Sequence, residues 1–119
     1  ESLATLADIK SHCDKSNKKL VVYLSMAFGN PYEEAYSEQL VLDLAKKLHE
    51  ELGIQELMLS DTIGAATPSL VQSLFEQATK YLPGVSFGAH LHSRYDIAQP
   101  IFFSAFVVGF ILFYGVKTV

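Results

Sequence analysis

The chain has 119 residues, the length of one domain or of a piece of a larger one. Its net charge of −4 at pH 7 argues against nucleic acid as a partner, because nucleic-acid binding requires a basic surface. A single cysteine, Cys13, excludes an internal disulfide and is typical of a reducing compartment. The chain begins with Glu1 rather than methionine, so we expect the true N-terminus and any targeting signal to be missing.

Charged residues stop abruptly near residue 96. Of the 22 charged side chains, 21 lie in residues 1–96, whereas the last 23 residues contain only Lys117. The same final stretch contains six of the fourteen aromatic residues. We therefore expect a folded unit over residues 1–96 and a hydrophobic tail of different character over residues 97–119.

The first half of the chain predicts a helix, a strand and a second helix. Apolar residues at helical spacing predict a short helix over residues 3–13. Residues 20–24 form a short, apolar, β-branched run, which is typical of a strand buried on both faces of a parallel sheet. Leucine and valine then recur at helical spacing over residues 40–52, with Ser37 as the predicted N-cap and Gly53 as the terminating glycine.

The second half predicts a strand, a helix and a third strand. The second strand is expected at residues 56–60. Thr67 is the predicted N-cap of the following helix, Pro68 occupies its first position, and its apolar face recurs over residues 70–78. The third strand is expected at residues 85–89. The predicted order is therefore αβαβαβ.

Alternating helices and strands predict parallel strands joined by helical crossovers, in a doubly wound sheet or a (β/α)₈ barrel. In both architectures function collects at the carboxyl ends of the strands. Polar residues follow all three predicted strands at that end. They are Ser25 and Asn30, then Ser60, Asp61 and Thr62, then His90 and His92. This recurrence predicts an active-site face at the carboxyl edge of the sheet.

The two histidines of this set are separated by a single residue. Because side chains alternate along a strand, we expect the rings of His90 and His92 to point the same way, with Cα atoms roughly 6–7 Å apart. That arrangement allows both rings to bind one divalent metal ion. Two histidines are half of such a site, so the remaining ligands decide its chemistry.

Three segments together match a known family. They are LVVYLSMAFGNPY at residues 20–32, LSDTIG at residues 59–64 with Thr67 and Pro68, and the His90-Leu-His92 motif. This combination closely resembles hydroxymethylglutaryl-CoA lyase, of the pyruvate-carboxyltransferase-like superfamily of metal-dependent TIM barrels. The resemblance covers about residues 1–96 and is similar to the fifth to seventh βα units of that family. It implies an α/β fold, a fragment of a (β/α)₈ TIM barrel followed by an atypical hydrophobic tail.

The resemblance implies roles for the polar residues. His90 and His92 match the family's ligands for a divalent cation, Mg²⁺ or Mn²⁺. Asp61 and Thr62 match the loop beside the acyl-CoA, with Asp61 and His90 as catalytic residues. Ser25 and Asn30 match the substrate-facing loop after the fifth strand.

The implied reaction is cleavage of 3-hydroxy-3-methylglutaryl-CoA to acetyl-CoA and acetoacetate. The family is typically homo-oligomeric, and it implies the cytoplasm or the mitochondrial matrix as the compartment. One alternative is an acyl-transferring synthase of the same superfamily, of the isopropylmalate or homocitrate synthase type. The other is a non-catalytic remnant whose tail binds a membrane or a partner.

Several family features are absent from this chain. It lacks the Asp-Arg-Glu signature and the Gly-Gly-Cys-Pro loop of the family. Three strands do not close an eight-stranded barrel, and their edges are expected to stay unpaired. We therefore expect the chain alone to be inactive and poorly soluble.

The tail contains a run without charges, residues 101–116, that is slightly shorter than the roughly 20 residues that span a bilayer. We favour an abnormal C-terminus, produced by a frame change, a retained intron or a gene-model error, over a membrane anchor at residues 97–119. The remaining histidines, His12 and His49, lie on polar helical stretches, and we expect both rings to face solvent.

Overall fold

The computed structural model describes residues 2–29, 36–61, 63–93 and 112–118. They form a four-stranded sheet in the order β1-β2-β3-β4, in which every neighbouring pair is parallel. The strands are β1 (Val22–Leu24), β2 (Glu56–Ser60), β3 (Ser86–Ser93) and β4 (Leu112–Thr118). The helices are α1 (Ser2–Lys15), α2 (Glu38–Leu52) and α3 (Pro68–Tyr81).

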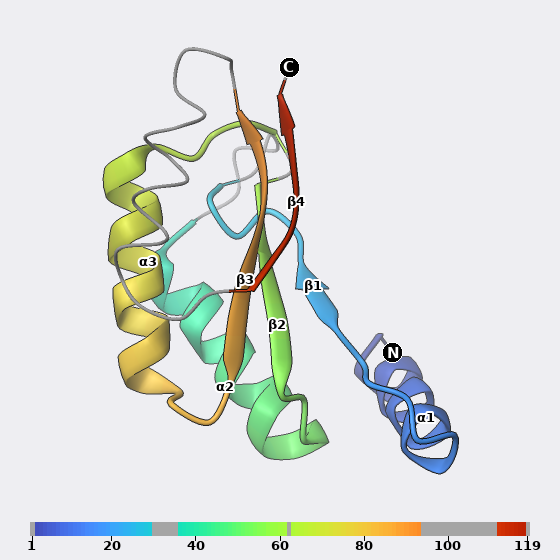
Figure 1. Ribbon diagram of the computed structural model, residues 1–119. Coiled ribbons are helices and arrows are strands. Elements are labelled where there is room, and N and C mark those ends of the chain that lie inside the picture. Colours follow the sequence, from blue (N-terminus) through green and yellow to red (C-terminus); the bar gives the residue numbers. More distant parts are fainter. Residues whose placement is uncertain (1, 30–35, 62, 94–111, 119) are drawn as a thin grey trace.

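Helices α2 and α3 lie side by side on one face of the sheet, and α1 lies beside the start of β1 (Figure 1). The predicted α/β order of three helices and three parallel strands is confirmed.

The core lies between the sheet and helices α2 and α3. Alternate strand residues point into it, because successive side chains of a strand point to opposite faces. The strand residues of this core are Leu24, Leu57, Leu59, Phe87, Ala89 and Leu91, and they pack against Leu42, Ala45, Leu48, Val71, Leu74, Phe75 and Ala78 of the helices. The intervening strand residues therefore point to the opposite face, which we call the distal face.

The predicted helix boundaries are confirmed by their caps. The hydroxyl of Ser37 accepts a hydrogen bond from the Leu40 backbone N–H at 3.2 Å, and Gly53 ends α2 with a left-handed φ of 69°. The hydroxyl of Thr67 accepts from the Leu70 N–H at 3.3 Å, and Pro68 is the first residue of α3. Each cap satisfies backbone groups that a helix end leaves without an intrahelical partner.

Two strand boundaries differ from the prediction. Strand β1 begins at Val22 rather than at residue 20, because its ladder with β2 starts where Val22 pairs with Leu57. Strand β3 is longer than residues 85–89 and runs to Ser93. It pairs with β2 on one side and with β4 on the other, so the ladder continues through His90 and His92.

Strand β4 was not expected. It lies in the tail and pairs with β3 in parallel, so the expectation that this edge of β3 stays unpaired is wrong. Residues 97–111 of the tail lie outside the described part of the chain, and so does most of the run that suggested an anchor. Among the residues that the structure describes, no helix has the length and apolar content to cross a membrane.

The two remaining histidines differ in their surroundings. His12 is exposed, as expected. His49 is partly buried, and its Nδ1 lies 2.7 Å from the carbonyl oxygen of Ile54, so the expectation that its ring faces solvent is wrong. The left-handed turn at Gly53 folds Ile54 back against the last turn of α2, and the ring then meets this carbonyl. Sequence pattern on the helix alone gives no sign of that return.

Candidate functional site at the carboxyl edge of the sheet

At the carboxyl edge, backbone hydrogen bonds join the loops after β1 and β2 to the neighbouring strand. In the loop after β1, the N–H of Ala27 donates to the carbonyl of Ser60 at 3.0 Å. In the loop after β2, the N–H of Asp61 donates to the carbonyl of His90 at 2.9 Å. The ends of the first three strands are therefore held in a fixed arrangement, as the predicted active-site face requires.

Asp61 is buried within its own loop. One carboxylate oxygen accepts from the Ala65 N–H at 2.9 Å and the other accepts from the Ala66 N–H at 3.0 Å. The residue is 1% exposed. Both oxygens are thus used to shape the turn that leads into α3, with Gly64 at a left-handed φ of 73°. A contact between Asp61 and substrate stays a prediction.

His90 stands on the distal face beside a tyrosine of β1. The rings of His90 and Tyr23 meet edge to face, with centroids 5.9 Å apart and an angle of 75° between their planes. Tyr23 is 47% exposed, and His90 is partly buried. The imidazole is therefore oriented by an aromatic neighbour and retains access to solvent.

The structure describes the other predicted site residues only in part. His92 lies in β3 two residues after His90 and pairs with Lys117 of β4, but its side chain is outside the described part of the structure. A common orientation of the two rings stays a prediction. Ser25 is exposed in the turn directly after β1. Asn30 and Thr62 lie outside the described residues.

Ser60 also lies at the carboxyl edge, where it is buried next to His90. It is the last residue of β2, it pairs with His90, and it is 6% exposed. Its hydroxyl oxygen has no hydrogen-bond partner among the described residues. Sequence analysis placed Ser60 at a strand end but gave it no role, because burial there depends on the neighbouring strands.

The ladder between β3 and β4 is irregular next to His90. Ala89 pairs with Phe113, but His90 pairs with Gly115, so β4 has one extra residue at this point. Such bulges are common beside active sites because they change which residues face each other. Here the bulge places a residue without a side chain opposite His90.

The described residues contain no group of three or more histidine, cysteine or acidic residues that could hold a metal ion. Asp61, the carboxylate that follows β2 at this edge, is already bonded to backbone N–H groups. Because Mg²⁺ prefers a shell of oxygen ligands, the described residues do not form a complete shell for this ion.

Tyr36 fastens the loop after β1 to the start of α2. Its hydroxyl donates to the carbonyl of Ala27 at 2.7 Å. Burial, reinforced by the nearby charge of Glu38, raises the pKa of Tyr36 to about 12. The neutral phenol is therefore the form that the folded chain favours.

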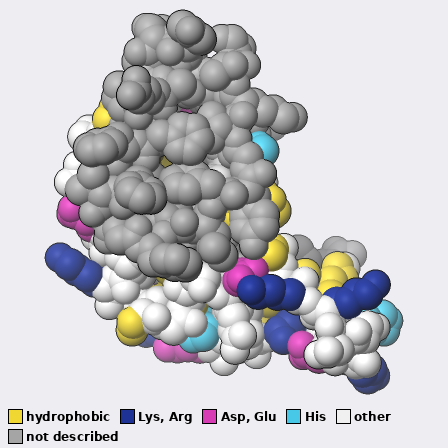
Figure 2. Space-filling model, in the orientation of Figure 1, with side chains coloured by type: hydrophobic (Ala, Val, Ile, Leu, Met, Phe, Trp, Pro, Cys, Tyr) yellow, Lys and Arg dark blue, Asp and Glu magenta, His cyan; other side chains and the backbone are white. Residues whose placement is uncertain are grey.

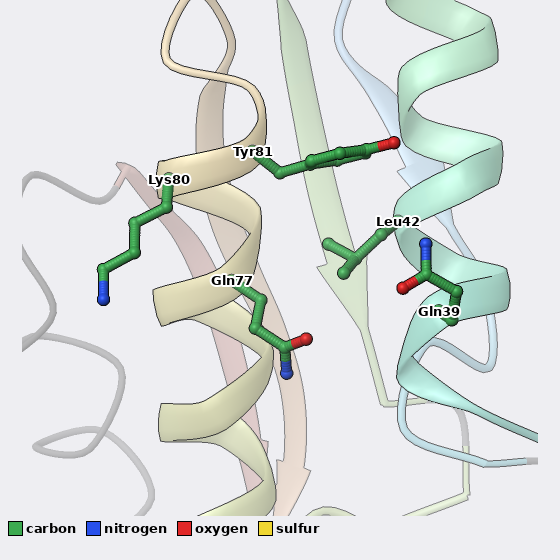
Figure 3. A pocket seen from close by; sticks show the side chains of 5 residues that line it. All are labelled: Gln39, Leu42, Gln77, Lys80 and Tyr81. Carbon is green, nitrogen blue, oxygen red and sulfur yellow. The ribbon is translucent and has the colours of Figure 1, made fainter.

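Two surface hollows among the described residues lie away from this edge. A groove of about 330 Å³ between α2 and α3 is lined by Gln39, Leu42, Gln77, Lys80 and Tyr81, with Tyr81 reaching from α3 toward α2 (Figure 3). A smaller hollow of about 120 Å³ lies at the amino ends of β1 and β2. It includes Lys10, Lys18 and Lys19, in the region near α1 where basic side chains gather (Figure 2), and Lys19 pairs there with the buried Glu56. Neither hollow includes a predicted site residue.

Parallel strands, helical crossovers and polar loops at one edge are the features of a fragment of a TIM-barrel fold. No protein-family model matches the chain. Its sequence is 35% identical over 115 residues to hydroxymethylglutaryl-CoA lyase of Bacillus subtilis, a match that covers 97% of this chain and 38% of the relative. Similar lyases also include a cytoplasmic enzyme of rat and a mitochondrial enzyme of mouse.

Solved structures agree with the sequence comparison. The crystal structure of the Bacillus subtilis lyase superimposes with a TM-score of 0.86 at 34% identity, over 98% of this chain and 39% of that one. A lyase from Acinetobacter baumannii, in complex with coenzyme A and 3-methylmalate, has the same fold with a TM-score of 0.79 at 24% identity, over 97% of this chain and 37% of that one. The resemblance to hydroxymethylglutaryl-CoA lyase is thereby confirmed for a part of that enzyme.

The extent of the match corrects one expectation. Because the alignment with the Bacillus subtilis relative spans 115 residues, or 97% of this chain, the similarity continues into the tail rather than ending near residue 96. A boundary between two regions at that residue stays a prediction. The chain spans about two fifths of the length of this relative.

The buried carboxylate gives the first testable prediction. We expect Asp61→Ala to lower the free energy of unfolding by about 1–3 kcal/mol, because two N–H groups of the loop lose a charged acceptor. Urea unfolding of the full chain measures it. Asp8→Ala, at an exposed position of α1, is the control and is expected to change stability by less than about 0.5 kcal/mol. Equal effects of the two substitutions would contradict a structural role for Asp61.

Tyr36 gives a pH-dependent prediction. A phenol whose pKa is near 10 in the unfolded chain and about 12 in the folded chain contributes stability below pH 10 that is lost as the pH rises toward 12. We expect Tyr36→Phe to remove this component, so that its free energy of unfolding declines less between pH 10 and pH 12 than that of the unaltered chain. Tyr23→Phe, which removes an exposed hydroxyl, is the comparison variant. Parallel pH curves for the unaltered chain and Tyr36→Phe would refute the prediction.

Proposed function

We propose that the chain forms part of the active site of a divalent-metal-dependent lyase that cleaves 3-hydroxy-3-methylglutaryl-CoA to acetyl-CoA and acetoacetate. Its similarity to the Bacillus subtilis lyase supports the reaction class. The observation that carries the proposal is the hydrogen bond from the Asp61 N–H to the carbonyl of His90. It joins the two motifs that resemble the family into a single edge of the sheet.

His90 and His92 are the residues that we assign to the cation. The described residues supply only part of a shell, so we expect the other ligands to come from outside them. A divalent cation bound at this edge supplies Lewis-acid polarisation of hydroxyl and carboxylate oxygens. The contribution of this chain is an imidazole on the distal face, held in place by Tyr23.

We assign catalytic contact to His90 and a positioning role to Asp61. The carboxylate of Asp61 is 1% exposed and bonded to two N–H groups, so it acts by fixing the loop next to His90 rather than by touching the substrate. Thr62 follows it in that loop. This assignment refines the implied role of Asp61 as a catalytic residue beside the acyl-CoA.

The proposed substrate is an acyl-CoA. A similar lyase binds coenzyme A and 3-methylmalate, a thiol carrier and a small branched hydroxydicarboxylate. We place Ser25 and Asn30 in the loop that faces such a substrate, because Ser25 is exposed directly after β1. The synthase alternative has less support, since the similar proteins described above are lyases.

Histidine NMR tests the metal assignment. The full chain is titrated with Mn²⁺, whose unpaired electrons broaden nearby ring signals. We expect the His90 and His92 signals to broaden at lower Mn²⁺ than those of His12 and His49, which serve as internal controls. Equal broadening of all four signals, or earlier broadening of the control rings, would contradict the assignment.

Turnover tests the contribution of the chain by itself. The chain spans 38% of its Bacillus subtilis relative, and its described residues lack a complete metal shell. We therefore expect no release of acetoacetate from 3-hydroxy-3-methylglutaryl-CoA by the purified chain with Mg²⁺ or Mn²⁺. The full-length Bacillus subtilis lyase is the positive control. Turnover at a rate comparable to that control would show that the other parts are dispensable.

A further inference from the structure

Ser60 carries a buried hydroxyl that the assignments above do not use. The residue is 6% exposed, and its Oγ has no hydrogen-bond partner among the described residues. Buried polar side chains are nearly always hydrogen-bonded, and a serine hydroxyl provides one donor and two acceptor sites. The backbone of Ser60 is held on both sides, since its carbonyl accepts the Ala27 N–H and the residue pairs with His90 in the β2–β3 ladder. The unsatisfied hydroxyl is thus held in a rigid position.

That position is beside His90. Residues paired on neighbouring strands point to the same face and stand roughly 4.8 Å apart, so the Ser60 hydroxyl and the His90 ring are neighbours on the distal face. An oxygen atom that lies between two such side chains is within hydrogen-bond distance of both. The other partner of His90 is Gly115, which adds no side chain on the opposite side. Both neighbours of His90 in the sheet are therefore small.

We propose that Ser60 is a positioning residue for the ligand, and this inference rests on the proposed function. Its hydroxyl donates a hydrogen bond to a carboxylate oxygen of the small hydroxy-acid part of the substrate, which lies against His90. A carboxylate is the acceptor that we favour, because hydrogen bonds to charged acceptors are stronger than those to neutral ones. This bond satisfies the buried hydroxyl and sets the orientation of the ligand relative to the imidazole.

The test uses 3-methylmalate as the probe. The full chain is titrated with this compound at a fixed concentration of Mg²⁺, and binding is followed by the NMR shifts of the backbone amides of β3. We expect Ser60→Ala to raise the dissociation constant about tenfold, which corresponds to the loss of one hydrogen bond to a charged group. Ser60→Thr, which keeps the hydroxyl, is expected to raise it less than about threefold. Ser86→Ala is the matched control, because Ser86 lies on the same face of the sheet at the opposite end of β3.

The outcomes separate this inference from the proposed function. If the unaltered chain binds 3-methylmalate and Ser60→Ala binds it equally well, the role of Ser60 is overturned and the proposed function stands. If the unaltered chain shows no binding, the role of Ser60 is overturned, whereas the proposed function is judged by the Mn²⁺ titration of His90 and His92. Urea unfolding gives a second measurement: removal of an unsatisfied hydroxyl leaves the midpoint of Ser60→Ala unchanged or higher. A lower midpoint, or failure of this variant to fold, would show that the hydroxyl bonds within the protein and would overturn the inference.

Discussion

One hydrogen bond sets the arrangement of the candidate site: the N–H of Asp61 donates to the carbonyl of His90 at 2.9 Å. It joins the end of β2 to β3 at the point where the polar residues gather. The carboxylate of the same aspartate shapes the loop that follows, so one residue aligns a strand end and the entry to α3. The position of His90 relative to its neighbours, and with it the case for a ligand site, depends on this junction.

Local sequence signals predicted the order of the elements well, because those signals act over a few residues. Ser37, Gly53, Thr67 and Pro68 mark helix ends through bonds or dihedral angles that each residue forms nearby. Features that depend on distant parts of the chain were missed. The pairing of β4 with β3 and the burial of Glu56 beside Lys19 arise only when the chain has folded back on itself. The contact of His49 with Ile54 spans only five residues, but it depends on the left-handed turn at Gly53 between them.

The same distinction applies to the candidate site. The sequence predicted which strand ends carry polar residues, and the structure brings the ends of β2 and β3 together through Ser60, Asp61 and His90. The sequence did not predict which groups each of these side chains contacts. A carboxylate in a loop has the same pattern whether it faces a ligand or, as Asp61 does, its own backbone. The orphaned hydroxyl of Ser60 is visible only once its neighbours exclude water.

The bulge between β3 and β4 decides which residue of β4 lies opposite His90. If the ladder continued from Ala89 and Phe113 without this bulge, Tyr114 rather than Gly115 would be the partner of His90. The residue that lies opposite His90 is therefore decided by the register of β4, and a shift of one position would put an aromatic ring where the chain now has a hydrogen atom.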